Sequence, residues 1–388
     1  MQTTNHILMI RPVDFKFNEQ TAANNKFQVA SETQDVQLQA LKEFDGFVKL
    51  LRQNDVDVTV VDDTLQPETP DSIFPNNWVS FHEDGSVYLY PMFSENRRLE
   101  RRKEILEGLK TRFELNHVSD LSFYEMQYAF LEGTGSMVLD RTNKIAYACL
   151  SVRTDEEVLN NFCMLSGYEP VVFQAVDSDN FPIYHTNVMM CIGDRFAVVC
   201  LDSIRDAEER LQVSISLKGS GKEIIEISLE QMNKFAGNML QVSNTAGESL
   251  LVMSEQAYLS LNPEQIETLK RYSRIIYAPL YTIEKNGGGK ALPTPFWQIP
   301  SGLTKMRRSH AAQNHRHIDV RAPGDMLACR CTPVKQDGQQ ILSVDALHIL
   351  NELLENLFHC VASGDWTHRK VPATRPCGRS RMDASEEP

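Results

Sequence analysis

Apolar and polar positions along the chain repeat one order of elements: an amphipathic helix, a strand, a polar or glycine-bearing loop, and two strands joined by a tight turn. In the first copy, apolar residues between positions 38 and 51 recur at helical spacing, and 56–61 is typical of a strand. The loop at 74–77 follows, and two strands within 79–90 turn at 83–85. Four further copies carry their loops at 131–135, 184–187, 236–238 and 286–289.

Five repeats of this kind cannot each bury their apolar strands alone. An arrangement around a common axis buries every strand and gathers the five loops at one end, which creates a central pocket. The sequence therefore predicts an α/β fold, a five-fold pseudosymmetric ββαβ propeller over residues 1–289. The gathered loops offer Asn77, Glu132, His185, Asn187 and Asn238, a mixture of acid, base and amide groups that suits a small polar substrate.

The repeating pattern stops after the glycine run at 287–289. Prolines at 293 and 295 disfavour a central strand, and residues 290–388 hold six of the ten histidines and four of the eight cysteines. We therefore expect the fifth unit to be incomplete and residues 290–388 to form an atypical tail. Within that tail, apolar positions at helical spacing predict one amphipathic helix near 343–361.

The formal charge of -13 disfavours nucleic acid and anionic membranes as partners, because both repel an acidic protein. A small amino-acid ligand, zwitterionic or cationic, fits better. The sequence shows neither a signal peptide nor an apolar stretch long enough to span a bilayer, so we expect a cytoplasmic protein with mostly free thiols. Zinc-type cysteine pairs do not occur, and the glycine run lacks the Lys-Ser/Thr pair of a phosphate-binding loop, so we expect no metal and no cofactor.

Six short motifs, in this order and spacing, resemble those of the pentein-fold enzymes that modify guanidino groups. These enzymes are the amidinotransferases, arginine deiminases and dimethylarginine hydrolases, and the resemblance is closest to the citrulline-utilisation hydrolases. The motifs are ILMIRP at 7–12, TAANN at 21–25, FPNNW at 74–78, LEGTG at 131–135, HTN at 185–187 and GNM at 237–239. Each motif alone is weakly specific, whereas their order together is strongly so.

The resemblance implies a covalent mechanism, in which a cysteine thiolate attacks the guanidinium or ureido carbon and water hydrolyses the intermediate. His185 matches the general acid/base of the family, and Glu132 matches the carboxylate that orients the substrate or the base. Asn77 and Asn187 stand where deiminases carry aspartates. Because these amides are neutral, they fit an uncharged ureido group, as in citrulline, better than a guanidinium. Asn238 is expected among the substrate-binding residues.

Several arginines are candidates for binding the carboxylate of an amino-acid substrate. Arg98, or its neighbour Arg97, and Arg153 look similar to family arginines that make bidentate contacts with this group. Since most arginines are surface residues, a solvated helix start is the alternative for the arginines at 97–102.

The expected nucleophile is missing from the written sequence. The family places a cysteine shortly after the glycine run, whereas the next cysteine here is Cys329. We hypothesise a frameshift near codon 290, since Ala291-Leu292-Pro293 can be encoded so that the next frame reads Arg-Cys. The alternatives are a substitute nucleophile at Cys329 or Cys331, a catalytically dead amino-acid-binding protein, and amidino transfer to an amine in place of water.

Overall fold

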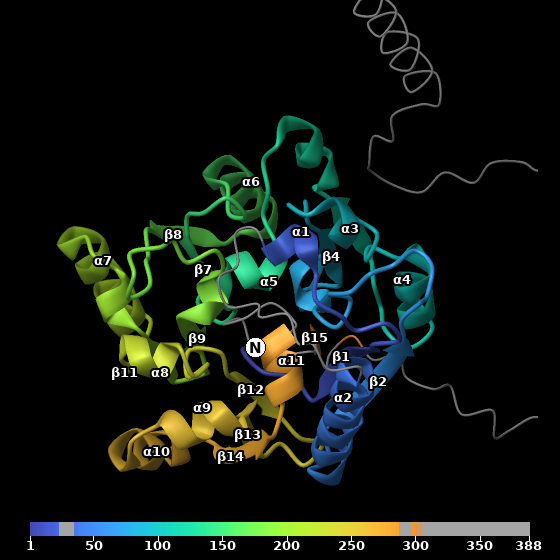
Figure 1. The fold of residues 1–388 in the computed structure, drawn as a ribbon. Coiled ribbons are helices and arrows are strands. Elements are labelled where there is room, and N and C mark those ends of the chain that lie inside the picture. The colour runs from blue at the N-terminus through green and yellow to red at the C-terminus, as the bar shows by residue number, and fades with distance from the viewer. Residues whose placement is uncertain (23–34, 287–296, 301–302, 304–388) are drawn as a thin grey trace, which may run out of the picture. The chain divides into compact units, whose positions relative to one another are not determined.

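The computed structural model describes residues 1–22, 35–286, 297–300 and 303 (Figure 1). These residues belong to one compact unit that spans Met1–His310. Within this unit, five three-stranded sheets follow one another around a ring, and the longer helices lie on its outer side (Figure 1).

All five sheets share one topology, in which the first two strands are antiparallel and the second and third are parallel. The sheets are β3 (Val79–Phe81), β4 (Ser86–Leu89) and β5 (His117–Asp120); β6 (Val138–Asp140), β7 (Ile145–Cys149) and β8 (Glu169–Phe173); β9 (Met190–Ile192), β10 (Phe196–Val199) and β11 (Glu223–Glu226); β12 (Leu240–Ser243), β13 (Ser249–Ser254) and β14 (Arg274–Ala278); and β15 (Trp297–Ile299), β1 (His6–Arg11) and β2 (Asp57–Asp62). A parallel pair needs a crossover connection, which contains a helix in every unit. These helices are α4 (Lys103–Lys110), α6 (Glu156–Ser166), α7 (Ala207–Gly219), α10 (Pro263–Lys270) and α2 (Val36–Gln53). The predicted ββαβ propeller is confirmed.

Shorter helical segments occupy the connections between the strands and crossover helices. They are α1 (Glu19–Ala22), η1 (Pro75–Asn77), α3 (Glu95–Arg98), η2 (Ser122–Gln127), α5 (Gly133–Ser136), η3 (Thr186–Val188), η4 (Leu201–Ser203), α8 (Leu229–Met232), α9 (Glu255–Ser260) and α11 (Tyr281–Asn286). Three of the predicted loops therefore contain a helical turn. Over the described residues, no helix is long and apolar enough to cross a bilayer. The helix predicted near 343–361 lies outside the described residues.

The fifth sheet is complete, which corrects the expectation of an incomplete fifth unit. Strand β15 pairs antiparallel with β1, with His6 opposite Ile299. The side chain of Ile299 is fully buried and belongs to the same apolar cluster as Leu8. β15 has three residues, lies at the edge of its sheet and begins after the prolines at 293 and 295, which lie outside the described residues.

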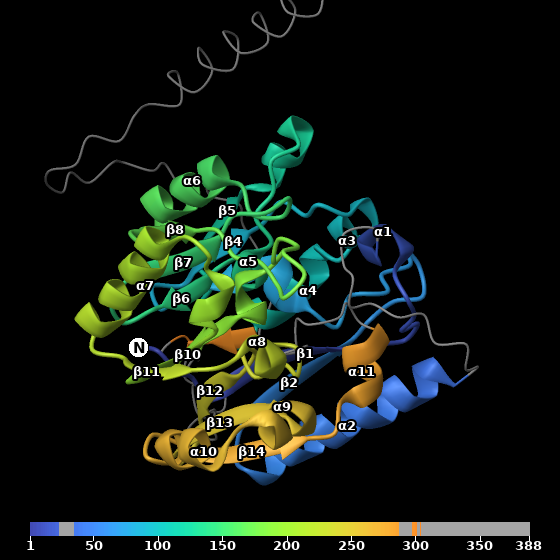
Figure 2. The same cartoon turned by 60° about the vertical axis from the view of Figure 1, so that its left-hand side comes forward.

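Helix α2 covers one face of the sheet that contains β1 (Figure 2). Its buried residues Phe44 and Leu51 share an apolar cluster with Ile7 and Met9 of β1. Leu8 of β1 belongs to a second cluster, so both faces of this strand are buried. The double burial explains why β1 is a continuous apolar run instead of an alternating one. Each large apolar side chain buried in this way stabilises the fold by roughly 1.5–3 kcal/mol.

Glycines allow the connections of neighbouring units to approach one another at one end of the ring. A Cβ atom at Gly133 would lie 2.3 Å from the backbone oxygen of Asn76, and this glycine also has a positive φ of 47°. A Cβ atom at Gly237 would lie 2.4 Å from the backbone oxygen of Val188. The first contact joins the first and second loops of the repeat, and the second contact joins the third and fourth.

Candidate active site

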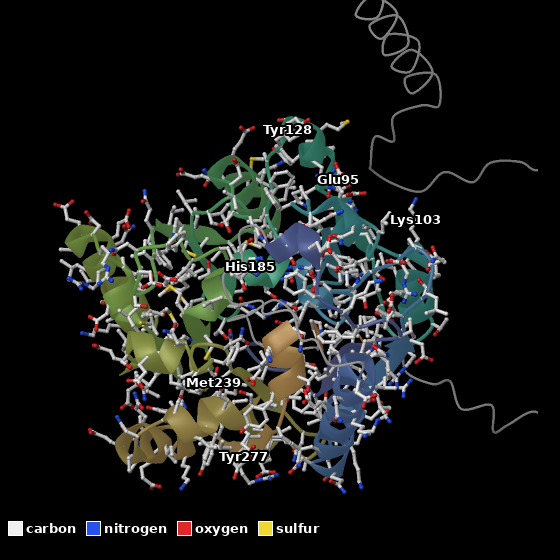
Figure 3. All side chains as sticks on the ribbon, in the orientation of Figure 1. Glu95, Lys103, Tyr128, His185, Met239 and Tyr277 are labelled. Carbon is white, nitrogen blue, oxygen red and sulfur yellow. The ribbon has the colours of Figure 1, made fainter. Side chains whose placement is uncertain are left out.

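Glu132 and His185 lie at the end of the ring where these loops meet. They directly precede α5 and η3, two helical turns of adjacent units that contact each other. His185 lies beside α5, toward the inside of the ring (Figure 3). The Nε2 atom of His185 is 2.7 Å from Oε2 of Glu132, and both side chains are buried. A Cβ atom at Gly135 would lie 2.3 Å from Nδ2 of Asn77 and 2.9 Å from Nδ1 of His185, so glycine is needed here.

Two hydroxyl groups tie together the segments that carry this pair. The Oγ atom of Ser136 accepts a hydrogen bond from the amide of Glu132 at 2.8 Å and donates one to the carbonyl of Arg153 at 2.6 Å. The Oγ1 atom of Thr186 donates to the carbonyl of Ser136 at 2.5 Å. Because Thr186 follows His185 directly, these bonds fix the two side chains relative to each other.

Two buried arginines flank Glu132. Nη1 of Arg153 lies 3.5 Å from Oε2 of Glu132, and Nη1 of Arg97 lies 3.7 Å from the same atom. Arg153 also donates to the carbonyl of Thr21 at 3.3 Å, and its guanidinium lies 4.9 Å from the ring centre of Tyr184. The structure therefore places Arg97 and Arg153 beside the predicted carboxylate.

Arg98 lies apart from this group. Its Nε donates to the carbonyl of Met92 at 3.0 Å, its Nη2 donates to the carbonyl of Phe93 at 3.3 Å, and it is 3.5 Å from Glu125. Consecutive residues of a helix point about 100° apart, so only one of the two neighbouring arginines on α3 faces the interior. That arginine is Arg97.

Buried carboxylates surround Arg97. Its Nε and Nη2 atoms each lie 2.9 Å from an oxygen of Glu100, which gives a bidentate pair, and its Nε is 3.9 Å from Asp71. Asp71 also accepts a hydrogen bond from Asn18 at 2.7 Å. Burial raises the pKa of Glu100 to about 7, and it raises the pKa of Asp71, although Arg97 opposes both shifts. Arg97 is therefore paired with a carboxylate whose pKa lies close to neutral pH.

Burial and charge together set the protonation of the central pair. Burial disfavours the carboxylate of Glu132, but Arg153, His185 and Arg97 outweigh it and lower the pKa of Glu132, so this group is ionised. Burial lowers the pKa of His185, and Glu132 offsets only part of the shift, so the imidazole is neutral at pH 7. A neutral imidazole that bonds a carboxylate through Nε2 carries its proton there. Nδ1 is then able to accept a proton, as a general base does.

Asparagines line a cavity of about 90 Å³ between the inner strands β6, β9 and β12. Asn76, Asn187 and Asn238 contribute to its wall. The Oδ1 atom of Asn187 and the Nδ2 atom of Asn238 are buried, and neither has a hydrogen-bond partner in the part of the chain that the structure describes. Asn77 has a different surrounding, because its Oδ1 accepts a hydrogen bond from Nη1 of Arg97 at 3.0 Å. Two of the predicted amides thus reach the cavity, whereas Asn77 joins the arginine cluster.

The cysteines that the structure describes are buried thiols. They are Cys149, Cys163, Cys191 and Cys200. Burial raises the pKa of Cys200 to about 11 and the pKa of the other three to about 12, so none of the four is an activated thiolate. Residues 287–296, Cys329 and Cys331 lie outside the described residues. Among the described residues, no group of three or more His, Cys, Asp and Glu side chains could hold a metal ion.

Three residues of this region were not singled out from the sequence: Asp71, Glu100 and Asn76. Acidic residues in short polar segments look like ordinary surface residues, which hides Asp71 and Glu100. The one available signal was the spacing of Glu100 three residues after Arg97, which suits an ion pair on a helix. Asn76 is hidden because its neighbour Asn77 has the same chemistry.

A five-unit ββαβ ring whose loops converge on a buried glutamate and histidine has the architecture of the penteins. The family model for eukaryotic N,N dimethylarginine dimethylhydrolases matches residues 11–292, most of the length of the chain. The protein therefore belongs to the dimethylarginine dimethylhydrolase family. A comparison with curated proteins found no match.

Solved structures share this fold. The substrate-bound N-terminal domain of ArgZ, an arginine dihydrolase from the ornithine-ammonia cycle in Cyanobacteria, is 16% identical with a TM-score of 0.60, over 76% of this chain and 98% of that one. Unliganded AgrE is 17% identical with a TM-score of 0.57, over 77% of this chain and 40% of that one. Dimethylarginine dimethylhydrolase from Pseudomonas aeruginosa, complexed with citrulline, is 16% identical with a TM-score of 0.52, over 77% and 100%. At these identities the likeness shows the fold alone.

Proposed function

We propose that this protein acts on the C–N bond of a guanidino or ureido group in a small amino acid, as a hydrolase that uses a covalent cysteine mechanism. The observation that carries the proposal is the buried pair of Glu132 and His185, flanked by Arg97 and Arg153 at the loop end of the ring. The relatives support the substrate class, since ArgZ is an arginine dihydrolase and the Pseudomonas enzyme was crystallised with citrulline.

The residues suggest the following course for a ureido substrate. A thiolate attacks the ureido carbon, and the C–N bond to the amino-acid side chain breaks as that nitrogen takes a proton. The carbamoyl group stays on sulfur until water attacks it, which gives carbamate and restores the thiolate. His185 is suited to move both protons, because it is neutral and Glu132 fixes its orientation. Arg153 would hold the carboxylate of the amino acid, because the guanidinium of Arg97 is already paired with Glu100 and Asn77.

We propose further that the nucleophile is absent from the written sequence. The buried thiols of the described residues do not supply it, and the sequence from 287 to 328 contains no cysteine. The frameshift hypothesis near codon 290 accounts for this absence. Strand β15 argues against this hypothesis, because a strand at 297–299 that pairs with β1 and buries Ile299 means that the sequence beyond the glycine run still contributes to the ring.

The first test is to read the genomic DNA across codons 280–310 and to measure binding and turnover on the protein. Calorimetry with L-citrulline and L-arginine reports binding, and ammonia release reports turnover. We expect binding to the chain as written, and turnover only in Leu292→Cys, with Leu292→Ser as the matched control. If the frame is confirmed as written and Leu292→Cys also binds without turnover, the hydrolase proposal fails and the protein is an amino-acid-binding pentein. Products that form only with an added amine would indicate amidino transfer.

A further inference from the structure

A second cavity, of about 100 Å³, lies at the end of the ring opposite Glu132 and His185. The inner strands β3 and β6 begin at the loop end and finish in hairpin turns at 82–85 and 141–144, and these two turns supply part of the cavity wall. The wall contains His82, Glu83, Arg141, Lys144 and Tyr168. None of these residues belongs to the candidate active site, so the cavity is a separate feature of the ring.

Two positively charged side chains converge on this cavity. Arg141 is half-buried, and its Nη1 donates to the carbonyl of Phe81 at 3.1 Å, which fixes the guanidinium in the wall. Lys144 is exposed, and its Nζ lies 4.6 Å from the ring centre of Tyr168. Among the described residues, neither Arg141 nor Lys144 forms an ion pair with a carboxylate. The carboxylate in the wall, that of Glu83, lies 2.8 Å from the amino group of the first residue.

His82 and Tyr168 form the buried part of the wall. Their side chains are almost fully buried, and their ring centres lie 5.9 Å apart. The Nε2 atom of His82 is 2.8 Å from Oγ of Ser80. Burial lowers the pKa of His82 well below its usual value, and the charges of Arg141 and Lys144 lower it further, so the imidazole is neutral at pH 7. Charges that disfavour a proton in this wall favour an anion in the cavity beside it.

An arginine without an ion pair is not in itself a binding site. Arg195 also forms no ion pair with a carboxylate among the described residues, and its guanidinium lies 5.1 Å from the ring centre of Tyr272. Arg195 is exposed and lines neither this cavity nor the one between β6, β9 and β12. Arg141 and Lys144 differ from it because both reach one enclosed space, in a protein whose net charge of -13 otherwise repels anions.

We propose that this cavity is a second ligand site, which binds a phosphate group between Arg141 and Lys144. The forked guanidinium of an arginine pairs with two phosphate oxygens at once, and the ammonium of a lysine adds a point charge. A cavity of about 100 Å³ has room for several water molecules, so a phosphate group fits into it. The group belongs either to free phosphate or to a small phosphorylated molecule. The site does not depend on the proposed hydrolase function, because the two share no residue.

The test is calorimetry on the full chain with inorganic phosphate, at pH 7.5 and constant ionic strength. We expect one saturable site with a Kd on the order of 1 mM or tighter. Arg141→Gln should weaken binding about tenfold or more, because it removes charged hydrogen bonds to the ligand. Lys144→Gln should weaken it about threefold or more, and it covers the case in which Arg141→Gln does not fold, since Lys144 is exposed. Arg195→Gln is the matched control and should change the Kd less than about twofold.

Nuclear magnetic resonance of the histidine rings shows where the anion binds. Phosphate should shift the ring signal of His82 and leave that of His185 unchanged. The proposal is wrong if no saturable binding occurs by about 20 mM phosphate, if all three variants weaken binding equally, or if the signal of His185 shifts in place of that of His82. Glycerol 3-phosphate, titrated in the same way, separates the two sources of the group. Tighter binding than that of phosphate supports a phosphorylated molecule, and weaker binding supports free phosphate.

Discussion

Glu284 on α11 offers a test of the buried electrostatics that does not depend on any ligand. Its side chain is 3% exposed, and neither carboxylate oxygen has a hydrogen-bond partner among the described residues. Burial raises its pKa from 4.5 to about 7, and the nearby charge of Glu43 adds to the shift. The uncharged form of Glu284 is therefore the one that fits the folded protein.

The raised pKa of Glu284 sets both the direction and the size of the change in stability with pH. Since the pKa of Glu284 is higher in the folded state, the folded protein holds this proton more tightly than the unfolded chain does. The contribution of Glu284 to the free energy of unfolding is therefore fully present below about pH 4.5 and is lost as the pH rises through about 7. At about 1.4 kcal/mol per pKa unit, the loss is about 3 kcal/mol by pH 8. Glu284→Gln keeps the shape and cannot ionise, so it escapes this loss.

We expect Glu284→Gln to be about as stable as the unmodified protein at pH 5 and about 2–3 kcal/mol more stable at pH 8. Urea unfolding followed by circular dichroism at both pH values measures the difference. The comparison cancels the pH dependence of Glu100, which is present in both proteins. Glu230→Gln, at an exposed position of α8, should show no pH-dependent difference. Equal differences for Glu284→Gln at pH 5 and pH 8 would refute the reasoning.

Three further changes test other parts of the structure. Glu132→Gln removes the charge between two buried arginines, so the free energy of unfolding should fall by about 3–5 kcal/mol, and a loss below about 1 kcal/mol in urea would contradict the observed ion pairs. Gly135→Ala places a methyl group 2.3 Å from Asn77 Nδ2, so we expect at least about tenfold weaker citrulline binding by calorimetry; unchanged binding would mean that the loops shift freely. Ile299→Ala should cost about 2–4 kcal/mol in urea unfolding, and a cost near zero would show that β15 does not pack.

Periodicity predicted most of the ring, because each helix and strand buries one face and its apolar spacing records that burial. The helical spacing of apolar residues between positions 38 and 51, for example, predicts the helix that is found as α2 at Val36–Gln53. Strand β15 was missed because three residues are too few to show a period, and because its position depends on β1, far away in the sequence. The closing of the ring is therefore a tertiary effect that no local pattern contains.

The chemical types of the candidate site residues could be predicted from the loop sequences, whereas the direction in which each side chain points could not. Arg97 and Arg98 have the same side chain one position apart, and only the rotation of α3 decides which one reaches Glu132. Asn76 and Asn77 pose the same problem in η1. Their roles in binding remain predictions, although the structure now specifies which of each pair to mutate.

The pairing of β15 with β1 has a consequence for synthesis. β1 is the first of the described strands to leave the ribosome, and its antiparallel partner is made almost 300 residues later. Until then, the backbone amides and carbonyls along one edge of β1 lack their partner strand. An unpaired strand edge readily forms hydrogen bonds with another chain. A chain that stops before residue 297 keeps this edge permanently, so premature termination should favour aggregation of the nascent protein.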